Sequence, residues 1–236
     1  MYRVAILAGG LATRLRPVTA TIPKALIEIA GKPFICHQLN YLRDQGITSV
    51  VMCIGFLGEL IQDLIGDGSA WGLKVTYSLD GQFLLGTGGS LKKALPLLGD
   101  DFFVLYGDSY LPIDFLGIQT AYIQSQKPAL MTILKNEDLW DKSNVQFDGK
   151  SILEYNKNHN SGEMTYIDYG LSILSASVLM RHSENPPFDL SKVYNELSLD
   201  GQLAGYEVFE RFYEIGSHQG IADTNTYFLK KIIAKD

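Results

Sequence analysis

The sequence predicts a single α/β domain built on an open, doubly wound and mostly parallel sheet that carries a small insertion. Three observations support this fold class. Short apolar or β-branched runs alternate with longer segments of helical period through the first half of the chain, as is typical of parallel sheets covered by helices. The 236 residues suffice for one core with insertions and do not require two. No Pro- or Ser-rich linker and no internal repeat divides the sequence.

The elements of the first half follow from these patterns in order. An apolar run at 4–8 predicts the first strand, which ends before two glycines. Pro33 opens the first long helix, because proline is favoured at the start of a helix, and Gly46 ends it. The further predicted elements are strands at 49–54, 73–77, 102–106 and 130–134, with helices at 58–65, 88–95 and 115–126.

The second half is more mixed. Asp148-Gly149 predicts the turn of a hairpin between 144–147 and 151–155, inside an insertion at about 135–165. Segments 166–172 and 205–215 have the composition of strands. Ser217 is expected to cap a final helix that runs towards Ile233.

Composition and charge exclude several classes of protein. Hydrophobic residues make up 46% and charged residues 19% of the chain, so we expect a packed core. The formal net charge of −6 has the wrong sign for a protein that holds a nucleic-acid backbone. No apolar run reaches ~18 residues, and the run before Gly9 is too short for a signal peptide. We therefore expect no nucleic acid, no membrane and no secretion.

The two cysteines, Cys36 and Cys53, fall in a predicted helix and a predicted strand. We expect neither a disulfide framework nor a thiolate zinc site from such a pair. We expect a reducing, cytoplasmic location instead. His159, His182 and His218 lack the spacing of metal ligands and are expected at the surface.

A glycine loop follows the first strand and predicts a phosphate site. Gly9 and Gly10 let the backbone turn with its amides exposed, a geometry that binds phosphate oxygens. The spacing matches neither a dinucleotide fingerprint nor a P-loop. Arg14, Arg16 and Lys24 bring three cations close to these amides in an otherwise acidic protein. This clustering favours a polyphosphate ligand.

Asp108 is the best candidate for a metal ligand. It follows the apolar run 102–106 and so lies at the carboxyl edge of the predicted sheet, where open α/β folds bind ligands. Mg²⁺ prefers carboxylate and phosphate oxygens and is held by one or two protein carboxylates. A second acid is therefore expected to converge on it.

These residues resemble the sugar-1-phosphate nucleotidylyltransferase family. The family signature, L-A-G-G-x-[GA]-T-R-[LM]-x-P-x-T followed by P-K-x-L, is matched by 7–19 and 23–26. The resemblance continues through Gly31-Lys32-Pro33, Gly86-Thr87-Gly88-Gly89 and Gly107-Asp108, so it covers the first 120 residues closely. The short chain looks most like the compact members that activate N-acetylmuramate 1-phosphate or heptose 1-phosphate.

The resemblance implies a Rossmann-like nucleotidyltransferase fold with a nucleotide-binding half (1–120) and a sugar-phosphate-binding half (121–236). It implies an enzyme that joins a nucleoside triphosphate, UTP or GTP, to a sugar 1-phosphate with Mg²⁺ as cofactor. Such enzymes serve nucleotide-sugar biosynthesis, here for cell-surface polysaccharide. The residues that it assigns are Arg14 and Lys24 (catalysis); Leu7, Ala8, Gly9, Gly10, Thr13, Gln82, Gly86, Thr87 and Gly88 (nucleotide); Glu154, Lys157 and Gly170 (sugar phosphate); Asp108 and Glu214 (metal).

The chain departs from the family pattern at three places. Glu214 stands where the family usually has Asp, the chain is one residue longer between Gln82 and Gly86, and Glu154 and Lys157 are one residue further apart than in the E-x-K segment of relatives. The Gln82 amide offers a donor and an acceptor, which suits the edge of uracil, whereas the paired donors of guanine are better met by a carboxylate. Gln82 therefore favours UTP.

Two alternative functions remain open from the sequence. A phosphocholine-type cytidylyltransferase would need an aromatic cage, for which Tyr155, Tyr166, Tyr169 and Tyr213 are candidates. A catalytically silent nucleotide-sugar sensor is suggested by Glu214 in place of Asp.

Overall fold

The computed structural model describes residues 1–136, 139–158, 162–182 and 185–234. The strands of its large sheet are β1 (Arg3–Leu7), β4 (Ser49–Ile54), β5 (Lys74–Leu79), β6 (Asp101–Tyr106), β8 (Ala129–Lys135), β9 (Val145–Phe147), β10 (Ile152–Tyr155), β11 (Tyr166–Ser175) and β12 (Leu203–Val208). Two short pairs lie outside it, β2 (Glu28–Ile29) with β3 (Lys32–Pro33) and β7 (Ser109–Tyr110) with β13 (Tyr213–Glu214). Most of these strands coincide with the predicted ones.

The helices are α1 (Phe34–Asp44), α2 (Gly58–Ile65), α3 (Gly86–Leu98), α4 (Phe115–Ser125), α5 (Ala176–Arg181), α6 (Leu190–Leu199) and α7 (His218–Ile233). Four 3₁₀ turns are η1 (Thr13–Leu15), η2 (Val18–Ala20), η3 (Lys24–Leu26) and η4 (Ser69–Trp71). Ser217 caps α7 as predicted, because its side chain accepts a hydrogen bond from the Gly220 amide. Within the described ranges, every helix is too short or too polar to cross a lipid bilayer.

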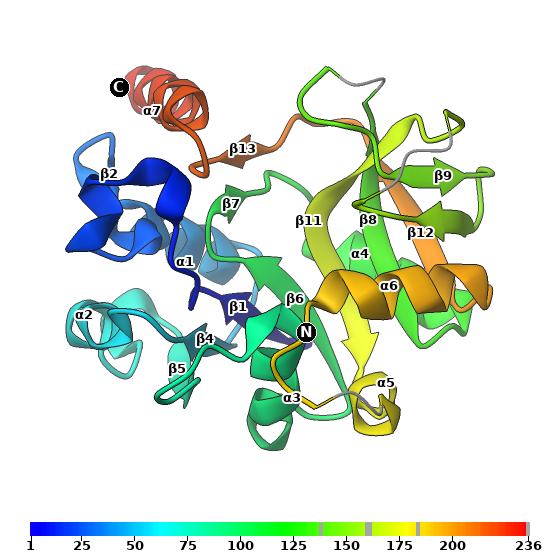
Figure 1. The fold of residues 1–236 in the computed structure, drawn as a ribbon. Coiled ribbons are helices and arrows are strands. Elements are labelled where there is room, and N and C mark those ends of the chain that lie inside the picture. Colours follow the sequence, from blue (N-terminus) through cyan, green and yellow to red (C-terminus); the bar gives the residue numbers. More distant parts are fainter. Residues whose placement is uncertain (137–138, 159–161, 183–184, 235–236) are drawn as a thin grey trace.

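The sheet confirms the predicted fold class. Neighbouring strands are parallel along β5-β4-β1-β6, which is the first half of the chain (Figure 1). β11 then pairs antiparallel with β6 and β8, and β12 pairs parallel with β8. The predicted hairpin forms as β9 and β10 and continues the sheet beyond β11. The described part of the expected insertion is thus an extension of the same sheet.

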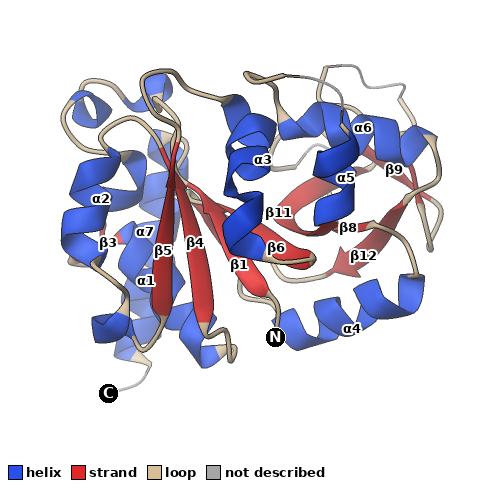
Figure 2. Cartoon of the chain, turned by 90° about the horizontal axis from the view of Figure 1, so that it is seen from below, coloured by secondary structure: helices blue, strands red, loops and turns tan. Residues whose placement is uncertain are grey.

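Hydrophobic cores lie on both faces of the sheet, because successive side chains of a strand point to opposite faces. On β1, Val4 and Ile6 belong to one core, together with residues of α1, α2 and α4. Ala5 belongs to the other, with residues of α3, α5 and α6. In Figure 2, α4 lies below the second half of the sheet and α5 and α6 lie above it.

Helices α5 and α6 were not expected from the sequence. The signal for α6 was nevertheless present. Asp189 caps the helix by accepting from the Ser191 amide, and Leu190, Val193 and Tyr194 are buried at helical spacing.

Candidate active site

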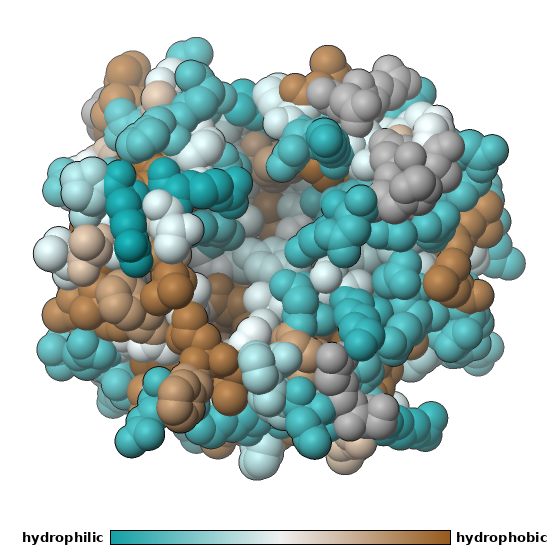
Figure 3. Space-filling view, in the orientation of Figure 1, coloured by the Kyte–Doolittle hydropathy of each residue, from teal (hydrophilic) through white to brown (hydrophobic). Residues whose placement is uncertain are grey.

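A cavity of about 230 Å³ opens at the carboxyl ends of the parallel strands. The space-filling view shows this face of the molecule hollowed near its centre (Figure 3). The cavity lies where β1, β4, β5 and β6 end, which is the edge at which open α/β sheets bind ligands. Its walls are formed by Leu7, Ala8, Gly9, Gly10, Ala12, Lys24, Ala25, Cys53, Asp80, Leu84, Gly86, Thr87, Ser90, Tyr106, Gly107 and Asp108. Eight of the residues predicted from the sequence are among them: Leu7, Ala8, Gly9, Gly10, Lys24, Gly86, Thr87 and Asp108.

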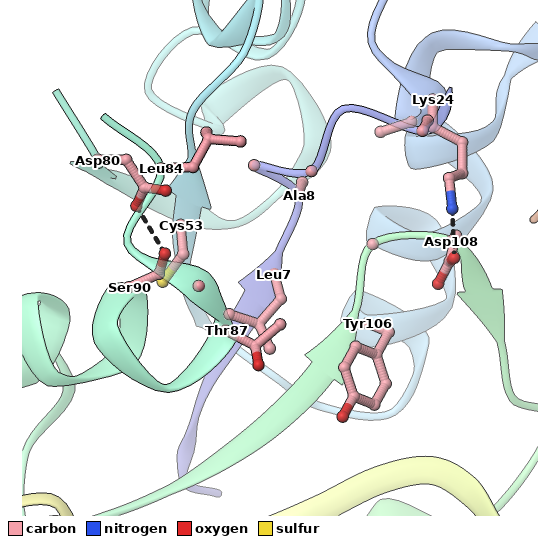
Figure 4. Close-up of a pocket in the computed structure, with 16 residues that line it drawn as sticks. Leu7, Ala8, Lys24, Cys53, Asp80, Leu84, Thr87, Ser90, Tyr106 and Asp108 are labelled. Carbon is pink, nitrogen blue, oxygen red and sulfur yellow. Dashed lines mark hydrogen bonds and ion pairs between the residues drawn. The ribbon is translucent and has the colours of Figure 1, made fainter. Parts of the chain in front are cut away.

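One end of the cavity holds an ion pair between Lys24 and Asp108. Lys24 Nζ lies 2.7 Å from Asp108 Oδ2 (Figure 4). Both side chains keep contact with solvent, at 21% and 29% exposure. The 3₁₀ turn η3 presents Lys24, and the chain leaving β6 presents Asp108. A cation and a carboxylate in this position can meet a phosphate and a metal ion.

Arg14 and Glu214 lie next to this ion pair, around Gly216. A Cβ atom placed on Gly216 would lie 3.6 Å from both Arg14 Nη2 and Asp108 Oδ2, and 2.6 Å from Glu214 Oε2. The pairing of β7 with β13 produces this arrangement, because it sets Glu214 opposite Ser109. The structure thus brings together the predicted arginine and both predicted metal ligands.

The carboxylate of Glu214 also holds the start of α7. Glu214 Oε2 accepts a hydrogen bond from the Gly216 amide, and Oε1 accepts from the Ser217 hydroxyl at 2.8 Å. The Thr224 hydroxyl donates to the Glu214 carbonyl at 2.9 Å. Each carboxylate oxygen therefore has one bonded donor and retains a further lone pair.

The donor set at this end fits a magnesium ion. Mg²⁺ prefers carboxylate and phosphate oxygens and commonly takes only one or two protein carboxylates. Asp108, directly before β7, and Glu214, at the end of the paired strand β13, supply two carboxylates. No cluster of three or more acidic, histidine or cysteine ligands occurs within the described part of the chain, so the remaining ligands of a bound ion would come from phosphate and water.

The glycine segment 86–89, which forms the first turn of α3, is packed against the segment before α6. A Cβ on Gly86, whose φ is +72°, would lie 2.4 Å from the Phe188 carbonyl oxygen, and one on Gly88 would lie 2.2 Å from the Phe188 ring. The Thr87 hydroxyl accepts from the Leu190 amide at 2.8 Å. Gly88 therefore serves the packing of Phe188, while Gly86 and Thr87 line the cavity.

One of the predicted sugar-phosphate residues, Lys157, lies beside Tyr106, which lines the cavity. Lys157 Nζ lies 5.8 Å from the centroid of the Tyr106 ring. Gly170 is buried in β11 with φ +103°, and its amide donates to Asp168 Oδ1 at 2.9 Å. Glu154 is half-buried and accepts from the Asn156 amide at 3.3 Å. None of the three predicted residues lines the cavity itself.

Asp168 is a carboxylate beside this group that the sequence reasoning missed. Burial raises its pKa, and the positive charge of Lys157 opposes that rise. Its signal in the sequence was weak, because an acid at an interior position of a strand is usually on a solvated face.

The opposite end of the cavity holds Asp80, a second carboxylate missed by the sequence reasoning. Asp80 directly follows β5 and is 8% exposed. Cys53 lies beside it, and burial, with a smaller contribution from the charge of Asp80, raises the pKa of that thiol to about 12. Asp108 was identified because it lies two residues after the predicted strand 102–106, and Asp80 lies three residues after the predicted strand 73–77, so a similar signal was present.

Three other predicted nucleotide residues do not line the cavity. Gln82 and Thr13 are exposed, and Gly88 is buried in the first turn of α3, against Phe188. Arg14 is also exposed and reaches the site only through its guanidinium near Gly216.

The four tyrosines proposed for an aromatic cage each pack against a different ring. The pairs are Tyr155 with Tyr194, Tyr166 with Phe147, Tyr169 with Phe212, and Tyr213 with Tyr227. The first and third of these tyrosines are fully buried. This arrangement does not favour the phosphocholine alternative.

Two of the three histidines expected at the surface lie in the described part. His218 is exposed, as expected. His182 is mostly buried instead, since its ring packs 4.7 Å from that of Phe188 and lies 3.5 Å from Glu196 Oε2. His159 lies outside the described residues.

Residues 3–144 match the model of the nucleotidyl transferase family. The aligned region includes the glycine loop, Lys24, Asp80 and Asp108.

Two curated relatives show how the first half compares with proteins of known activity. N-acetylmuramate alpha-1-phosphate uridylyltransferase of Neisseria meningitidis serogroup B is 45% identical over 118 residues, 49% of this chain and 51% of the relative. D-glycero-alpha-D-manno-heptose 1-phosphate guanylyltransferase of Campylobacter jejuni is 38% identical over 109 residues, 46% of this chain and 48% of the relative. The chain thus aligns with about half the length of each.

The fold also matches solved structures along nearly the whole chain. HddC from Yersinia pseudotuberculosis superposes with a TM-score of 0.82 at 26% identity, covering 97% of this chain and all of that one. Its complex with GMP-PN superposes with a TM-score of 0.79.

Proposed function

The chain belongs to the nucleotidyl transferase family, and from this premise we propose that it transfers a nucleoside monophosphate from a nucleoside triphosphate to a sugar 1-phosphate. The observation that carries the proposal is the ion pair of Lys24 and Asp108 at one end of a cavity lined by Gly9, Gly10 and Gly86. Its relatives named as a uridylyltransferase and a guanylyltransferase of sugar 1-phosphates support the same reaction.

The reaction is an in-line displacement at phosphorus. An anionic oxygen of the sugar 1-phosphate attacks the α-phosphorus of the triphosphate and forms a new P–O bond. The bond between the α-phosphorus and the bridging oxygen to the β-phosphorus breaks, and its electrons leave with pyrophosphate. The attacking oxygen is already deprotonated, so no general base is required, and catalysis consists of positioning and charge neutralisation.

Different cations of the site bind different phosphates of the two substrates. Arg14 and the amides of Gly9 and Gly10 hold the β- and γ-phosphates, which carry the charge of the leaving group. Lys24 leaves Asp108 Oδ2 to neutralise the α-phosphate, and Lys157 meets the phosphate of the sugar. Together they offset the repulsion between two anionic reactants.

Asp108 and Glu214 are the residues that would hold a magnesium ion in this site. When bound, Mg²⁺ supplies Lewis-acid neutralisation of phosphate oxygens. Asp108 offers an oxygen already turned towards Lys24, and Glu214 keeps its lone pairs available beside Gly216.

We place the reaction in the cytoplasm and its product in nucleotide-sugar biosynthesis for cell-surface polysaccharide. Support for a reducing location comes from Cys36 and Cys53, which are both buried as free thiols. The donor is UTP or GTP on the names of the relatives.

The test is Mg²⁺-dependent pyrophosphate release over a matrix of donors and acceptors. The donors are the four common ribonucleoside triphosphates and dTTP, and the acceptors are hexose, N-acetylated sugar and heptose 1-phosphates and phosphocholine. We expect one productive combination, with equal amounts of pyrophosphate and nucleotide-sugar. Pyrophosphate release with phosphocholine as the acceptor would contradict the proposal that the acceptor is a sugar 1-phosphate. Binding of nucleotide-sugars without turnover across the whole matrix would support the sensor instead.

A further inference from the structure

Gln38 is a buried amide on α1 to which the proposed chemistry gives no role. It shares the buried face of the helix with Ile35, Leu39 and Leu42, which belong to the hydrophobic core, and its own exposure is 2%. A polar side chain in such a place costs free energy unless hydrogen bonds replace those it makes with water. The partners of Gln38 therefore show what the amide does there.

The amide nitrogen of Gln38 holds both ends of the turn that carries Asp108. Nε2 donates to the carbonyl oxygen of Tyr106 at 3.0 Å and to that of Ser109 at 2.6 Å. Tyr106 is the last residue of β6 and Ser109 the first of β7, so the two acceptors flank Gly107 and Asp108. These contacts also fix the orientation of the amide, because Oε1 in place of Nε2 would face two carbonyl oxygens.

The amide oxygen of Gln38 shows that this contact has a cost. Oε1 is buried and has no hydrogen-bond partner among the described residues. A buried oxygen without a donor is destabilising, and an apolar side chain of the same size would avoid that cost in the core. The need for two N–H donors at the turn accounts for an amide at this position.

Two further hydrogen bonds hold the same turn from the side of the cavity. The Gly107 amide donates to the Leu7 carbonyl at 2.9 Å, and the Ile215 amide donates to the Asp108 carbonyl at 3.0 Å. A Cβ on Gly107 would lie 2.8 Å from the Leu7 carbonyl oxygen, so this approach requires glycine. The backbone at Asp108 is thus held by β1, by the segment after β13 and, through Gln38, by α1.

We propose that Gln38 is a positioning residue for nucleotidyl transfer, which keeps the Asp108 carboxylate where it can meet Lys24 and a magnesium ion. The inference rests on the proposed function for the role of Asp108 as a metal ligand. Gln38 does not line the cavity, so it acts through the turn and not on a substrate. Ligands held in place before the reaction need no rearrangement during it, and a displacement of ~1 Å can lower a rate by up to about 100-fold.

The test compares Gln38→Met with wild type and with the matched variant Gln45→Met. Methionine keeps the length of the side chain and removes both donors. Gln45 follows the same helix, and its Oε1 accepts from the Phe115 amide at 3.2 Å, outside the cavity. We expect Gln38→Met to lower kcat about 10-fold and to raise the Mg²⁺ concentration for half-maximal pyrophosphate release about 3- to 10-fold. Gln45→Met is expected to change neither quantity.

Two further measurements need no turnover. Electron paramagnetic resonance with Mn²⁺ alone, without nucleotide, measures metal affinity, which we expect to fall about 3- to 10-fold in Gln38→Met. Amide hydrogen exchange reports on the turn itself. The Gly107 and Ile215 amides, whose acceptors lie on either side of the turn, should exchange about 10-fold faster in Gln38→Met. A role in stability alone would instead raise exchange throughout the core and leave metal affinity unchanged.

These measurements separate the inference from the proposed function and from folding. Should Gln38→Met fail to fold, Gln38→Asn keeps the amide on a side chain one methylene shorter, which cannot reach both carbonyls, and is expected to show part of each effect. Unchanged Mn²⁺ affinity and an unchanged magnesium titration in a folded variant would overturn the inference and leave nucleotidyl transfer intact. Wild type that binds no Mn²⁺ would also overturn it. Wild type without pyrophosphate release would contradict the proposed function, while Mn²⁺ affinity and hydrogen exchange would still decide the role of Gln38.

Discussion

Lys24 and Asp108 lie 84 positions apart in the chain and form an ion pair with 2.7 Å between Nζ and Oδ2. Both side chains retain about a quarter of their exposure, and both line the cavity. A pair in this setting contributes little to stability because water screens it. If the proposed function is right, we expect a phosphate oxygen of the substrate to take the place of the Asp108 carboxylate at Lys24.

Lys24→Ala is expected to abolish most of the activity and to change the stability only slightly. Removing a cation that faces developing charge typically lowers kcat about 10²-fold or more. The free energy of unfolding is expected to change by no more than ~1 kcal/mol, because the pair is partly exposed. Steady-state kinetics and thermal unfolding measure the two effects. Lys74→Ala, at the exposed start of β5, is the control and should change neither. A Lys24→Ala variant with full turnover would remove Lys24 from the mechanism.

Asp108→Asn is expected to raise the Mg²⁺ concentration that gives half-maximal rate by at least about 10-fold, because a neutral amide oxygen is a much weaker ligand than a carboxylate. The measurement is a magnesium titration of pyrophosphate release. Asp44→Asn is a suitable control, because Asp44 is exposed and paired with Arg43 on α1, outside the cavity. An unchanged titration curve for Asp108→Asn would argue against Asp108 as a metal ligand.

Glu214→Gln separates the two roles of that carboxylate. Its oxygens accept from the Gly216 amide and the Ser217 hydroxyl at the start of α7. A glutamine presents only one acceptor to these two donors, so the variant should lose about 1–2 kcal/mol of stability. As the second metal ligand, Glu214 should also shift the magnesium titration, by less than Asp108→Asn does. Loss of stability with an unchanged titration would leave Glu214 as a helix cap alone.

Gly88→Ala is expected to change stability, and Gly10→Ala is expected to change triphosphate binding. A Cβ on Gly88 would lie 2.2 Å from the buried Phe188 ring, which must shift, at a cost of about 1–3 kcal/mol. A Cβ on Gly10 meets no atom within 4 Å, so folding is unaffected, but it enters the cavity beside the phosphate amides. Gly88→Ala should therefore lower the Tm, and Gly10→Ala should raise KM for the triphosphate. A lowered Tm for Gly10→Ala with a raised KM for Gly88→Ala would contradict the placement of these two glycines.

Asp168→Asn is expected to stabilise the protein at neutral pH. Burial raises the pKa of Asp168 above its ordinary value of 3.8. Below pH 3.8 the carboxyl is protonated in both states, and as the pH rises the unfolded chain ionises first, so the folded state loses stability until the raised pKa is passed. The Tm gain of Asp168→Asn should therefore be largest at pH 7 and shrink towards pH 4.

Asp148→Asn is the control of opposite sign for this pH dependence. The Asp148 carboxylate accepts from the Ser151 and Lys150 amides, and these bonds lower its pKa. Its contribution to stability is present at neutral pH and is lost as the pH falls through the lowered pKa. Asp148→Asn should thus lower Tm at pH 7. A Tm loss for Asp168→Asn at pH 7 would instead mean that the attraction between the Asp168 carboxylate and the positive charge of Lys157 outweighs the cost of burial.

The parallel half of the fold was predictable because local patterns determine it. The strand at 49–54 and the helix at 58–65 coincide with β4 and α2, since apolar period and flanking glycines mark their ends. The same patterns led to Asp108, because the end of a parallel strand is also the edge that binds ligands.

The site residues that were harder to predict depend on contacts between distant segments. Gly88 stands in a family motif, yet its lack of a side chain serves Phe188, 100 positions later. Gln82 and Asp80 are two residues apart, and only the loop geometry shows which one lines the cavity. Glu214 reaches Asp108 through the two-residue pairing of β7 with β13, which is too short to carry a sequence signal.

Single-turnover transfer from α-³²P-labelled UTP or GTP tests the central claim most directly. The protein is used in excess over the labelled triphosphate, with Mg²⁺ and each sugar 1-phosphate of the matrix in turn. The account predicts that with one combination of donor and acceptor all the label moves into a nucleotide-sugar, with an equal amount of pyrophosphate, and that without acceptor the label stays in the triphosphate. Should the label fail to reach any nucleotide-sugar, with UTP as well as with GTP, or appear as free nucleoside monophosphate, the account of this cavity as a sugar-1-phosphate nucleotidylyl transfer site would be contradicted.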